Sequence, residues 1–398
     1  MRIGEIAKVK GGKRLPKDKQ LLSSPTKHPY IKIKDMYQNR ELEITNDFEY
    51  IDEETYERIA KYTVCSGDVI IAIVGNTIGL VSLIGDSLDG ANLTENCVKL
   101  VDVKGYLNKY IYYYLISPMG QAQIHAGIVG SSQPKLPIYN VEKIELPDVS
   151  LDEQLRIVGI LDSIDCKIDN NTYLNQNLAE QIETLLIAFI DDEDTTPVKL
   201  GDYLYIKGRI GWKGLKKNEY LTQSEYRIIN GESLTKSGID WNKAGYISKE
   251  RYDESPEIML NIGDILLSKD GTIGKIGYVD ALELPTSVAS GIFVIRNNKP
   301  DIISTTFIYY LLKSKVFEAF IAARTEGSVI PHLYQKDFME FEFPLPNKEK
   351  MARFEEITES MFSQIVTNLN ENKKLATMRD SLLPKLMSGE LDVSEIEI

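Results

Sequence analysis

Two long stretches of the chain carry apolar residues at steps of mostly three and four positions, which is the pattern of an amphipathic helix. In the first stretch they are Leu151, Leu155, Val158, Leu161, Ile164, Ile168, Leu174, Leu178, Ile182, Leu185 and Phe189. In the second they are Met351, Phe354, Ile357, Met361, Ile365, Leu369, Leu375, Met378, Leu382 and Leu386. Each pattern lasts for about five heptads and predicts a coiled-coil-like helix of roughly 38–40 residues, ~60 Å long. An exposed seam of this length would aggregate, so we expect the two helices to pack on each other, antiparallel.

Local signals mark the ends of these helices. Ser150 with Glu153 is a capping-box start, and Asn347 is a candidate N-cap. Pro384 should bend or shorten the second helix near its end, and Gly389 should stop it. Two polar residues, Asn171 and Asn372, interrupt the seams. They either fix the register of the pair or lie just off the seam.

Outside these stretches the pattern is mixed. Short β-rich runs between glycine-rich turns predict strands, for example at 30–34, 69–74, 98–103 and 292–295. One helical stretch follows in each half, at about 105–126 and 302–323, and a last strand is expected at 144–147 and 341–344. The predicted fold class is therefore α+β, with a twisted, partly barrel-like sheet in each half.

The second half of the chain repeats the first at an offset of roughly 196 or 197 positions. Ile3-Gly4-Glu5 returns as Leu200-Gly201-Asp202, and Gly67-Asp68-Val69-Ile70 returns as Gly263-Asp264-Ile265-Leu266. Asn76-Thr77-Ile78-Gly79 returns as Gly271-Thr272-Ile273-Gly274, and Gly130-Ser131 as Gly327-Ser328. A period this long fits a whole domain with its connector. We therefore expect lobe one at 1–147, a helix at 148–196 ending at Thr196-Pro197, lobe two at 197–346, and a second helix with a tail at 347–398.

The two copies share glycine, proline and apolar positions but differ in most polar residues between them. Two equivalent lobes with different surfaces indicate a chain that binds two different targets in one way. The chain has 398 residues, of which 43% are hydrophobic and 26% charged, as expected of a soluble globular protein. The sequence shows no stretch that would span a membrane and no signal peptide. Three widely spaced cysteines favour reduced thiols in the cytoplasm over a disulfide framework or a zinc site.

The net charge of −13 is concentrated in the connectors. Residues 148–196 hold 2 basic and 12 acidic side chains, whereas lobes one and two are each neutral, with 18 and 19 of either sign. Basic residues crowd one loop of each lobe, between 8 and 19 and between 207 and 217. Such a patch is the footprint expected of a nucleic-acid binder. A solvated lysine-rich loop is the alternative, although its recurrence in both copies weighs against it.

Candidate catalytic sets are absent from the sequence. Only His28, His125 and His332 are available, none at metal-ligand spacing. There is no phosphate-binding G-x-x-x-x-G-K-[ST] loop, no dinucleotide fingerprint, and no Asn-Pro-Pro-aromatic motif of amino-methyltransferases. Asp68 and Asp264, which follow a glycine at a strand entry, are better explained as turn residues. The chain is therefore expected to be a non-catalytic recognition subunit whose partners carry out the chemistry.

The order of these features resembles the specificity subunit of type I restriction–modification systems over essentially the whole chain. The resemblance is carried by the duplicated lobe-and-helix order, by helices that follow Leu146-Pro147 and Pro344-Leu345-Pro346, by the Gly263–Gly274 segment and by the tail Leu382–Leu391. It implies two target recognition domains, each of which reads one half of a split double-stranded DNA sequence. The helices would set the gap between the half-sites and dock two methylation subunits. Two restriction subunits, each a motor and nuclease, would complete the assembly.

The resemblance also implies where the cofactors belong. None is expected in this chain. S-adenosylmethionine, for methylation of adenine, and ATP with Mg²⁺ are expected in the partner subunits. The sequence departs from the family pattern in the acidic run at 191–194, which has no assigned role, and in a weak correspondence between the ends of the two helices.

Candidate DNA contacts are basic residues of the first loop, which can neutralise phosphates, and other polar or basic residues that could reach base edges, where the lobes should differ. In lobe one they are Lys10, Lys13, Arg14, Lys17, Lys32, Lys34, Asn76, Thr77, Ser131, Ser132, Gln133 and Lys135. In lobe two they are Lys207, Arg209, Trp212, Lys213, Lys216, Asn230, Glu232, Ser233, Lys269, Thr272, Ser328 and His332. A second hypothesis is an assembly scaffold that uses the helices and two interaction lobes without binding DNA, which the acidic helices favour. A standalone enzyme lacks a nucleophile or metal set.

Overall fold

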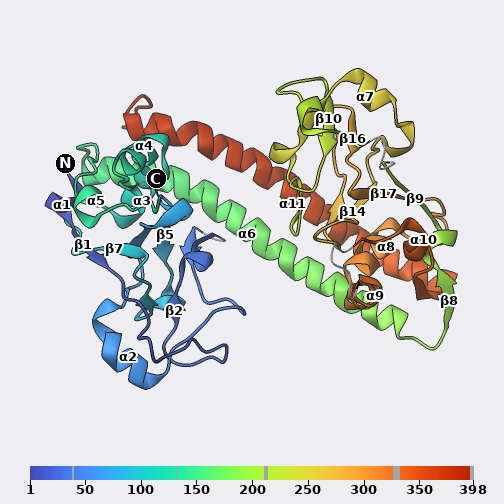
Figure 1. Ribbon diagram of the computed structural model, residues 1–398, viewed down its shortest axis with the longest axis horizontal. Coiled ribbons are helices and arrows are strands. Elements are labelled where there is room, and N and C mark those ends of the chain that lie inside the picture. The colour runs from blue at the N-terminus through green and yellow to red at the C-terminus, as the bar shows by residue number, and fades with distance from the viewer. Residues whose placement is uncertain (38–39, 131, 210–213, 326–331, 395–398) are drawn as a thin grey trace. The chain divides into compact units, whose positions relative to one another are not determined.

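The computed structural model describes residues 1–37, 40–130, 132–209, 214–325 and 332–394 (Figure 1). The chain divides into two compact units. Unit 1 comprises Met1–Asp169 and Asn372–Ile398, and unit 2 comprises Asn170–Glu371. Each unit therefore contains one lobe together with part of each long helix.

The two predicted long helices are present, as α6 (Leu151–Ile190, 40 residues) and α11 (Lys348–Ser388, 41 residues). Their N-caps are those expected, because Ser150 Oγ accepts the Glu153 amide at 3.2 Å and Asn347 Oδ1 accepts the Lys350 amide at 3.0 Å. In Figure 1 α6 is green and α11 is red.

The expected stop is also present, because α11 ends at Ser388 and the next residue, Gly389, has a φ of 72°. Of the two expected effects of Pro384, a bend or a shortened helix, the second is wrong, since α11 continues through it to Ser388. Leu383, Leu386 and Met387 are buried in the core of lobe one, and this packing stabilises the last turn despite the missing amide donor.

Within each unit the two helices pack in opposite directions. In unit 1 Arg379 Nη1 lies 2.9 Å from Asp165 Oδ1, and Asn372 Nδ2 donates to the Ile168 carbonyl at 3.3 Å. Residue numbers thus rise along α6 while they fall along α11, which confirms the antiparallel prediction.

Unit 2 repeats this polar pairing across the seam. Asn171 Nδ2 donates to Glu371 Oε2 at 2.8 Å, and Asn368 Nδ2 donates to Asn175 Oδ1 at 2.8 Å. Asn171, Asn175 and Asn368 are buried. Asn171 therefore belongs to the seam rather than lying beside it, and side-chain hydrogen bonds of this kind favour one register.

Lobe one is built on a five-stranded sheet in the order β1-β7-β4-β5-β3. The strands are β1 (Lys8–Gly11), β3 (Glu41–Leu42), β4 (Val69–Ala72), β5 (Val81–Ile84) and β7 (Cys97–Val101). Neighbours are antiparallel except for β3, which runs parallel to β5. A separate parallel pair joins β2 (Tyr30–Ile31) to β6 (Asn92–Leu93).

Lobe two repeats the four central strands of this sheet and the separate parallel pair, to which β13 is added. Its main sheet has the order β15-β14-β17-β9, and β10 pairs in parallel with β16. These strands are β9 (Leu204–Gly208), β10 (Tyr226–Ile229), β14 (Ile265–Ser268), β15 (Ile276–Tyr278), β16 (Thr286–Val288) and β17 (Ile292–Asn297). Further strands are β8 (Thr195–Lys199), β11 (Leu234–Thr235), β12 (Gly238–Ile239), β13 (Gly245–Ile247) and β18 (Glu342–Pro346). The sequence repeat is therefore a repeat of the central sheet topology, and the predicted α+β fold is confirmed.

Each expected single helix at 105–126 and 302–323 is in fact two short helices. They are α3 (Asn108–Ile116) with α4 (Pro118–Ala126), and α8 (Thr305–Lys313) with α9 (Lys315–Thr325). Ser117 causes the first break, because its backbone is extended and its side chain caps α4 through the Gly120 amide. The remaining helices are α1 (Ile3–Ile6), α2 (Glu53–Ile59), α5 (Ile138–Val141), α7 (Lys249–Asp253) and α10 (Gln335–Met339).

The expected last strand occurs in lobe two, where β18 pairs with β8. In lobe one the corresponding segment forms an isolated bridge between Arg2 and Glu145. The buried faces of α3 and α8 pack against the central sheet of their own lobe, with Tyr110 and Tyr113 in one core and Phe307 and Tyr310 in the other. Among the described residues, no helix combines the length and the apolar character that crossing a membrane requires.

Candidate nucleic-acid interface

One end of the central sheet of lobe one gathers several of the predicted residues. Strands β1 and β4 end there, at Gly11 and Ala72, and β7 begins there at Cys97. The Lys13 amide donates to the Leu93 carbonyl at 2.8 Å, and the Gly75 amide donates to the Pro134 carbonyl at 3.0 Å. We call the segments 12–14, 73–77, 94–96 and 132–135 the lobe-one sheet end.

The first loop can reach this end only because residue 12 is glycine. A Cβ at Gly12 would lie 2.1 Å from the Thr94 carbonyl oxygen. The next residue, Lys13, is exposed, with its ammonium 5.6 Å from the centre of the Tyr62 ring. Tyr30 fixes the backbone here, because its hydroxyl donates to the Lys13 carbonyl at 2.7 Å. The loop thus presents a cation from a rigid backbone.

Arg14 adds a second exposed cation, which forms an ion pair with Glu95 at 2.5 Å. Burial opposes ionisation of Glu95, but hydrogen bonds from Arg14 and neighbouring groups outweigh it and lower the pKa of this carboxyl. Arg14 is therefore held at the sheet end while most of its side chain stays in solvent.

The polar residues of the lobe-one sheet end lie on two adjoining turns. Val74 forms a bridge with Lys135, which places Asn76 and Thr77 beside the 132–135 segment. Asn76, Ser132, Gln133 and Lys135 are exposed, and the Thr77 hydroxyl donates to the Val74 carbonyl at 2.9 Å. The structure therefore brings Lys13, Arg14, Asn76, Thr77, Ser132, Gln133 and Lys135 together.

Other predicted cations of lobe one have partners or positions of their own. Lys32 and Lys34 both contact Glu49, the latter at 2.6 Å. Burial and repulsion by Lys34 lower the pKa of Lys32 to about 8. Lys10 is exposed on β1, and Lys17 is exposed further along the first loop.

In lobe two β9 and β14 end, and β17 begins, at the equivalent place. We call this place, with the turn 269–272 that follows β14, the lobe-two sheet end. Arg209 follows β9 but is 1% exposed, and its side chain donates to the Val288 carbonyl at 3.1 Å and to Ser287 Oγ at 3.3 Å. Burial lowers the pKa of Arg209. Its interactions thus lie inside the lobe, whereas Lys207 on β9 is exposed.

The turn after β14 carries the polar residues of this end. Lys269 is half-buried, with its ammonium 4.9 Å from the centre of the Phe293 ring, and burial lowers its pKa. Asp270 bridges His332 and their side chains also pair. This bridge repeats the one between Val74 and Lys135, so Lys135 and His332 occupy the same place in the two lobes. Thr272 is exposed on the same turn.

Asn230, Glu232 and Ser233 form a compact turn elsewhere in lobe two. Asn230 Oδ1 accepts the Glu232 amide at 2.9 Å and the Ser233 amide at 3.1 Å, and Ser233 is buried. Glu232 is exposed on this turn, and Lys216 is exposed on the segment that leads to it. Four predicted contacts lie outside the described residues: Ser131, Trp212, Lys213 and Ser328.

The acidic residues singled out in the sequence have local roles. Asp68 Oδ2 accepts the Cys65 amide at 2.9 Å and Asp264 Oδ2 accepts the Asn261 amide at 2.7 Å, so both are turn residues, as predicted. In the acidic run, Asp192 and Asp194 pair with Lys350 near the start of α11, at 2.5 and 3.1 Å. The run therefore ties the end of α6 to the start of α11 within unit 2.

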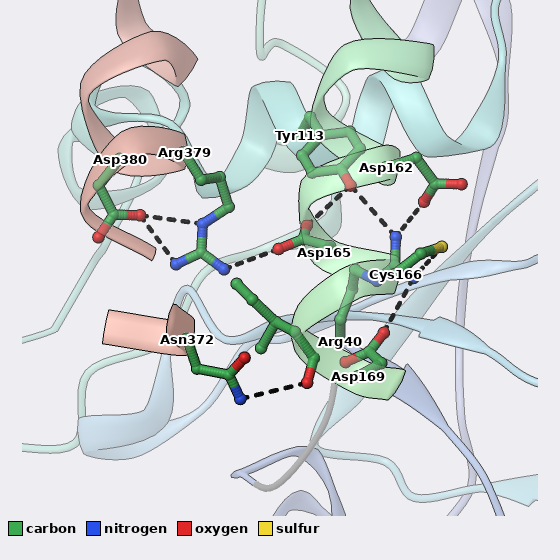
Figure 2. A network of polar contacts seen from close by, with 10 residues as sticks. Arg40, Tyr113, Asp162, Asp165, Cys166, Asp169, Asn372, Arg379 and Asp380 are labelled. Atoms are coloured by element: carbon green, nitrogen blue, oxygen red, sulfur yellow. Dashed lines mark hydrogen bonds and ion pairs between the residues drawn. The ribbon is translucent and has the colours of Figure 1, made fainter. Parts of the chain in front are cut away.

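A polar network that was not predicted from the sequence joins lobe one to the helices (Figure 2). Arg40 contacts Asp162, and it lies 3.2 Å from Asp169 and 3.1 Å from the Tyr113 hydroxyl. Desolvation opposes the charge of Arg40, but Tyr113 and Asp162 outweigh it and raise its pKa. A lone arginine in a polar loop carries no recognisable pattern, so only the structure identifies it.

The matching seam of lobe two is aromatic. At the offset of 197, Tyr113 corresponds to Tyr310 and Asp165 corresponds to Phe362. The rings of Tyr310 and Phe362 lie 6.2 Å apart, and Tyr278 and Tyr309 contact the same phenylalanine at 4.9 and 5.5 Å. In the aligned sequences a polar residue, Asp165, thus stands where the other copy has the aromatic Phe362. This difference is the signal in the sequence that points to the network.

Across the described part of the chain, no group of three or more His, Cys, Asp or Glu residues could hold a metal ion. The exposed groups at both sheet ends are hydrogen-bond donors, acceptors and cations. Such groups suit binding to phosphates and base edges.

Comparison with known proteins agrees with this geometry. The family model described as "Type I restriction modification DNA specificity domain" matches the chain twice, over residues 1–183 and 192–377. The type I restriction enzyme MjaIX specificity subunit of Methanocaldococcus jannaschii is 23% identical over 318 residues, which cover 75% of this chain and 72% of that protein. The MjaVIII specificity subunit of the same organism is 21% identical over 338 residues, or 76% and 75% of the two chains.

The solved structure of the type I restriction–modification S subunit from M. genitalium has a similar fold, with a TM-score of 0.58 at 19% identity. The match covers 97% of this chain and 95% of that one. The two copies, the two long helices and the family matches lead to one conclusion. This chain belongs to the type I restriction–modification DNA specificity family and is a non-catalytic specificity subunit.

Proposed function

We propose that each lobe reads one half of a bipartite double-stranded DNA target through its sheet end. The observation that carries this proposal is that two lobes of the same topology present different polar residues at the same place, Lys135 in one and His332 in the other. A shared scaffold with different side chains is what two different half-sites require.

The side chains of the two sheet ends can make both phosphate contacts and base contacts. Lys13 and Arg14 can neutralise phosphates, which fixes the position of the duplex without reading its sequence. Asn76 and Gln133 carry an amide donor and acceptor that can pair with adenine in the major groove, and Thr272 can pair with several bases. Asn76 and Gln133 are matched in the lobe-two sequence by Gly271 and Ile330, so base reading would rest chiefly on residues of this kind, which differ between the lobes.

We further propose that α6 and α11 set the gap between the half-sites and dock two methylation subunits. Several apolar residues of these helices are exposed, which supports docking of partner helices: Leu151, Leu155, Leu174, Ile187, Ile357, Leu369 and Met378. The methylation subunits would hold S-adenosylmethionine for adenine methylation. Two restriction subunits would use ATP and Mg²⁺ in the complete assembly. We expect this work to take place in the cytoplasm, which the free cysteines support.

Exchange of one lobe tests the proposal. Residues 1–147 are replaced by the corresponding lobe of another specificity subunit, and the methylated motif is mapped by methylation-sensitive sequencing. One half of the motif should change while the other half and the gap remain. A change in both halves would contradict separate reading by the lobes.

A scaffold that binds no DNA is the second candidate, because residues 148–196 are strongly acidic and the lobes are neutral. Gel-shift titration of the chain with a methylation subunit, across salt concentrations, separates the two functions. A scaffold would give no sequence preference at any salt, whereas a recognition subunit should keep a preference for its target as salt weakens binding to random duplexes.

A further inference from the structure

Lobe two contains a pocket of about 420 Å³ at a place that a side chain fills in lobe one. The pocket lies between the β11–β12 hairpin, the turn after β14, the start of β15 and helices α8 and α9. Its lining is formed by Lys236, Thr272, Ile273, Gly274, Lys275, Ile276, Leu312, Lys313, Glu318, Ile321 and Ala322. Three lysines thus face one glutamate, so the pocket is suited to an anion.

The hydrogen bond of Lys275 and the ring contacts of Lys313 are made to uncharged groups. Lys275 Nζ donates to the Gly231 carbonyl at 2.9 Å. Lys313 Nζ lies 5.3 and 5.5 Å from the ring centres of Tyr309 and Tyr310. Burial lowers the pKa of Lys313, with Glu183 acting in the opposite direction. An incoming anion would relieve the cost of gathering these cations.

The equivalent place in lobe one is filled by Gln121, which corresponds to Glu318. Gln121 Nε2 donates to the Gly79 carbonyl at 2.9 Å and to the Leu115 carbonyl at 2.8 Å. A Cβ on Gly79 would lie 2.7 Å from Gln121, whereas the nearest atom to a Cβ on Gly274 is in Ile321 at 3.6 Å. The site is therefore closed in lobe one and open in lobe two.

Residues next to this site also differ between the two lobes. Leu80 and Ile116 in lobe one correspond to Lys275 and Lys313 in lobe two. Two apolar positions have thus become basic in the one lobe where the site is open. A simple loss of packing would not require both changes.

We propose that this pocket binds a phosphate of the DNA backbone beside the half-site that lobe two reads. The proposal rests on the proposed function and adds a contact to it. Thr272 connects the two surfaces, because it lines the pocket and lies on the same turn as Lys269. A duplex whose bases meet the lobe-two sheet end brings its backbone to the adjoining pocket, and a phosphodiester matches the basic lining.

The test uses the full chain in complex with its methylation subunits. The first variant, Lys275→Gln with Lys313→Gln, removes two charges. The second variant, Lys236→Glu, reverses the third charge at the exposed turn between β11 and β12. Lys299→Gln, which removes an exposed lysine beside Tyr203, is the matched control. Affinity is measured at low and at physiological salt on a target duplex and on a scrambled duplex.

Both pocket variants should weaken binding to the two duplexes alike, by roughly tenfold at low salt. The salt slope should fall by about one for each phosphate that the protein no longer neutralises. A neutral methylphosphonate placed at successive backbone positions locates the phosphate. One position beside the lobe-two half-site should weaken the wild type and leave the double variant unaffected.

Three results would overturn the inference. They are a salt slope equal to that of the control, a methylphosphonate effect that persists in the variant, and a defect confined to assembly with the methylation subunit. The last would indicate an acidic protein partner instead. A wild-type complex that shows no preference for any duplex would contradict the proposed function itself. This outcome differs from the three results above, because it appears without any substitution in the pocket.

Discussion

The Tyr113 hydroxyl donates a hydrogen bond to Asp165 Oδ2 at 2.8 Å, and both groups are buried. Arg40 donates to the same hydroxyl at 3.1 Å, and Arg379 pairs with the other oxygen of Asp165 at 2.9 Å. A residue of α3 in lobe one is thereby linked to both long helices within unit 1 (Figure 2). The orientation of lobe one on its helices thus depends on a few specific bonds.

Removal of the Tyr113 hydroxyl should destabilise the packing of lobe one against the long helices within unit 1. Tyr113→Phe leaves Asp165 buried with one partner fewer, so we expect a loss of about 1–3 kcal/mol. Tyr310→Phe is the control, since its ring packs against Phe362 where Tyr113 meets a carboxylate. Amide hydrogen exchange of α3 and α8 reports each lobe separately. Equal protection of α3 in the two variants would show that the bond contributes nothing.

The same seam should respond to acid through Asp162. Burial raises the pKa of this carboxyl, but hydrogen bonds from Lys109 and Arg40 outweigh it, and the net pKa is lowered. The folded state therefore binds fewer protons than the unfolded state just below an ordinary carboxyl pKa of ~3.9. The stabilisation is present above that pH and is lost as pH falls through the folded pKa.

Asp162→Asn should accordingly destabilise lobe one at pH 7, and its difference from the wild type should shrink as the pH falls below about 4. Urea unfolding at several pH values, followed by the same α3 exchange probe, measures this difference. Asp18→Asn, which removes one partner of an exposed pair with Arg58, controls for a general charge effect. A difference that does not change with pH would mean that Asp162 acts by packing alone.

Lys13 and Arg14 offer a test of phosphate binding at the lobe-one sheet end. Lys13→Ala with Arg14→Ala should weaken binding to every duplex and flatten the salt slope by about one to two, because phosphate contacts carry little sequence information. Lys8→Ala is a matched control, since Lys8 is exposed at the opposite end of β1 and pairs with Asp102 at 2.7 Å. If the double variant and the control give the same slope, these cations are ordinary surface residues.

The helices and the duplicated fold could be predicted from the sequence because they follow from periodic features. The apolar steps, the caps at Ser150 and Asn347 and the stop at Gly389 each depend on neighbouring residues only. The pattern does not predict the break at Ser117, because its apolar flanks continue the helical spacing while its side chain caps the next helix. Pro384 does not end α11, because burial of Leu386 and Met387 stabilises the last turn.

The sequence predicts which types of residue form the candidate site, but it predicts their positions in the fold less well. Exposed loop residues such as Lys13, Asn76 and Gln133 meet at one sheet end because strand order brings distant turns together, which no local pattern encodes. Arg209, like Arg14, lies in the basic loop after the first strand of its sheet, yet it is buried among carbonyls of its own lobe. Networks such as that of Arg40 join segments more than 100 residues apart, as from Arg40 to Asp162. Their members carry no signal until the fold is known.

The last prediction concerns the helices as a spacer. Insertion of four residues into α6 near Asn175 lengthens it by ~6 Å and turns the following face by only ~40° from its original direction. Because DNA rises ~3.4 Å per base pair, the gap between the half-sites should grow by one or at most two pairs, while both half-sites stay the same. A two-residue insertion turns the apolar face by ~200° and would separate pairs such as Asn175 and Asn368, so it should fold or assemble poorly. Methylation-sensitive sequencing reads the gap, and size-exclusion chromatography reports assembly. An unchanged gap in a well-assembled four-residue variant would show that the helices do not set the spacing on DNA.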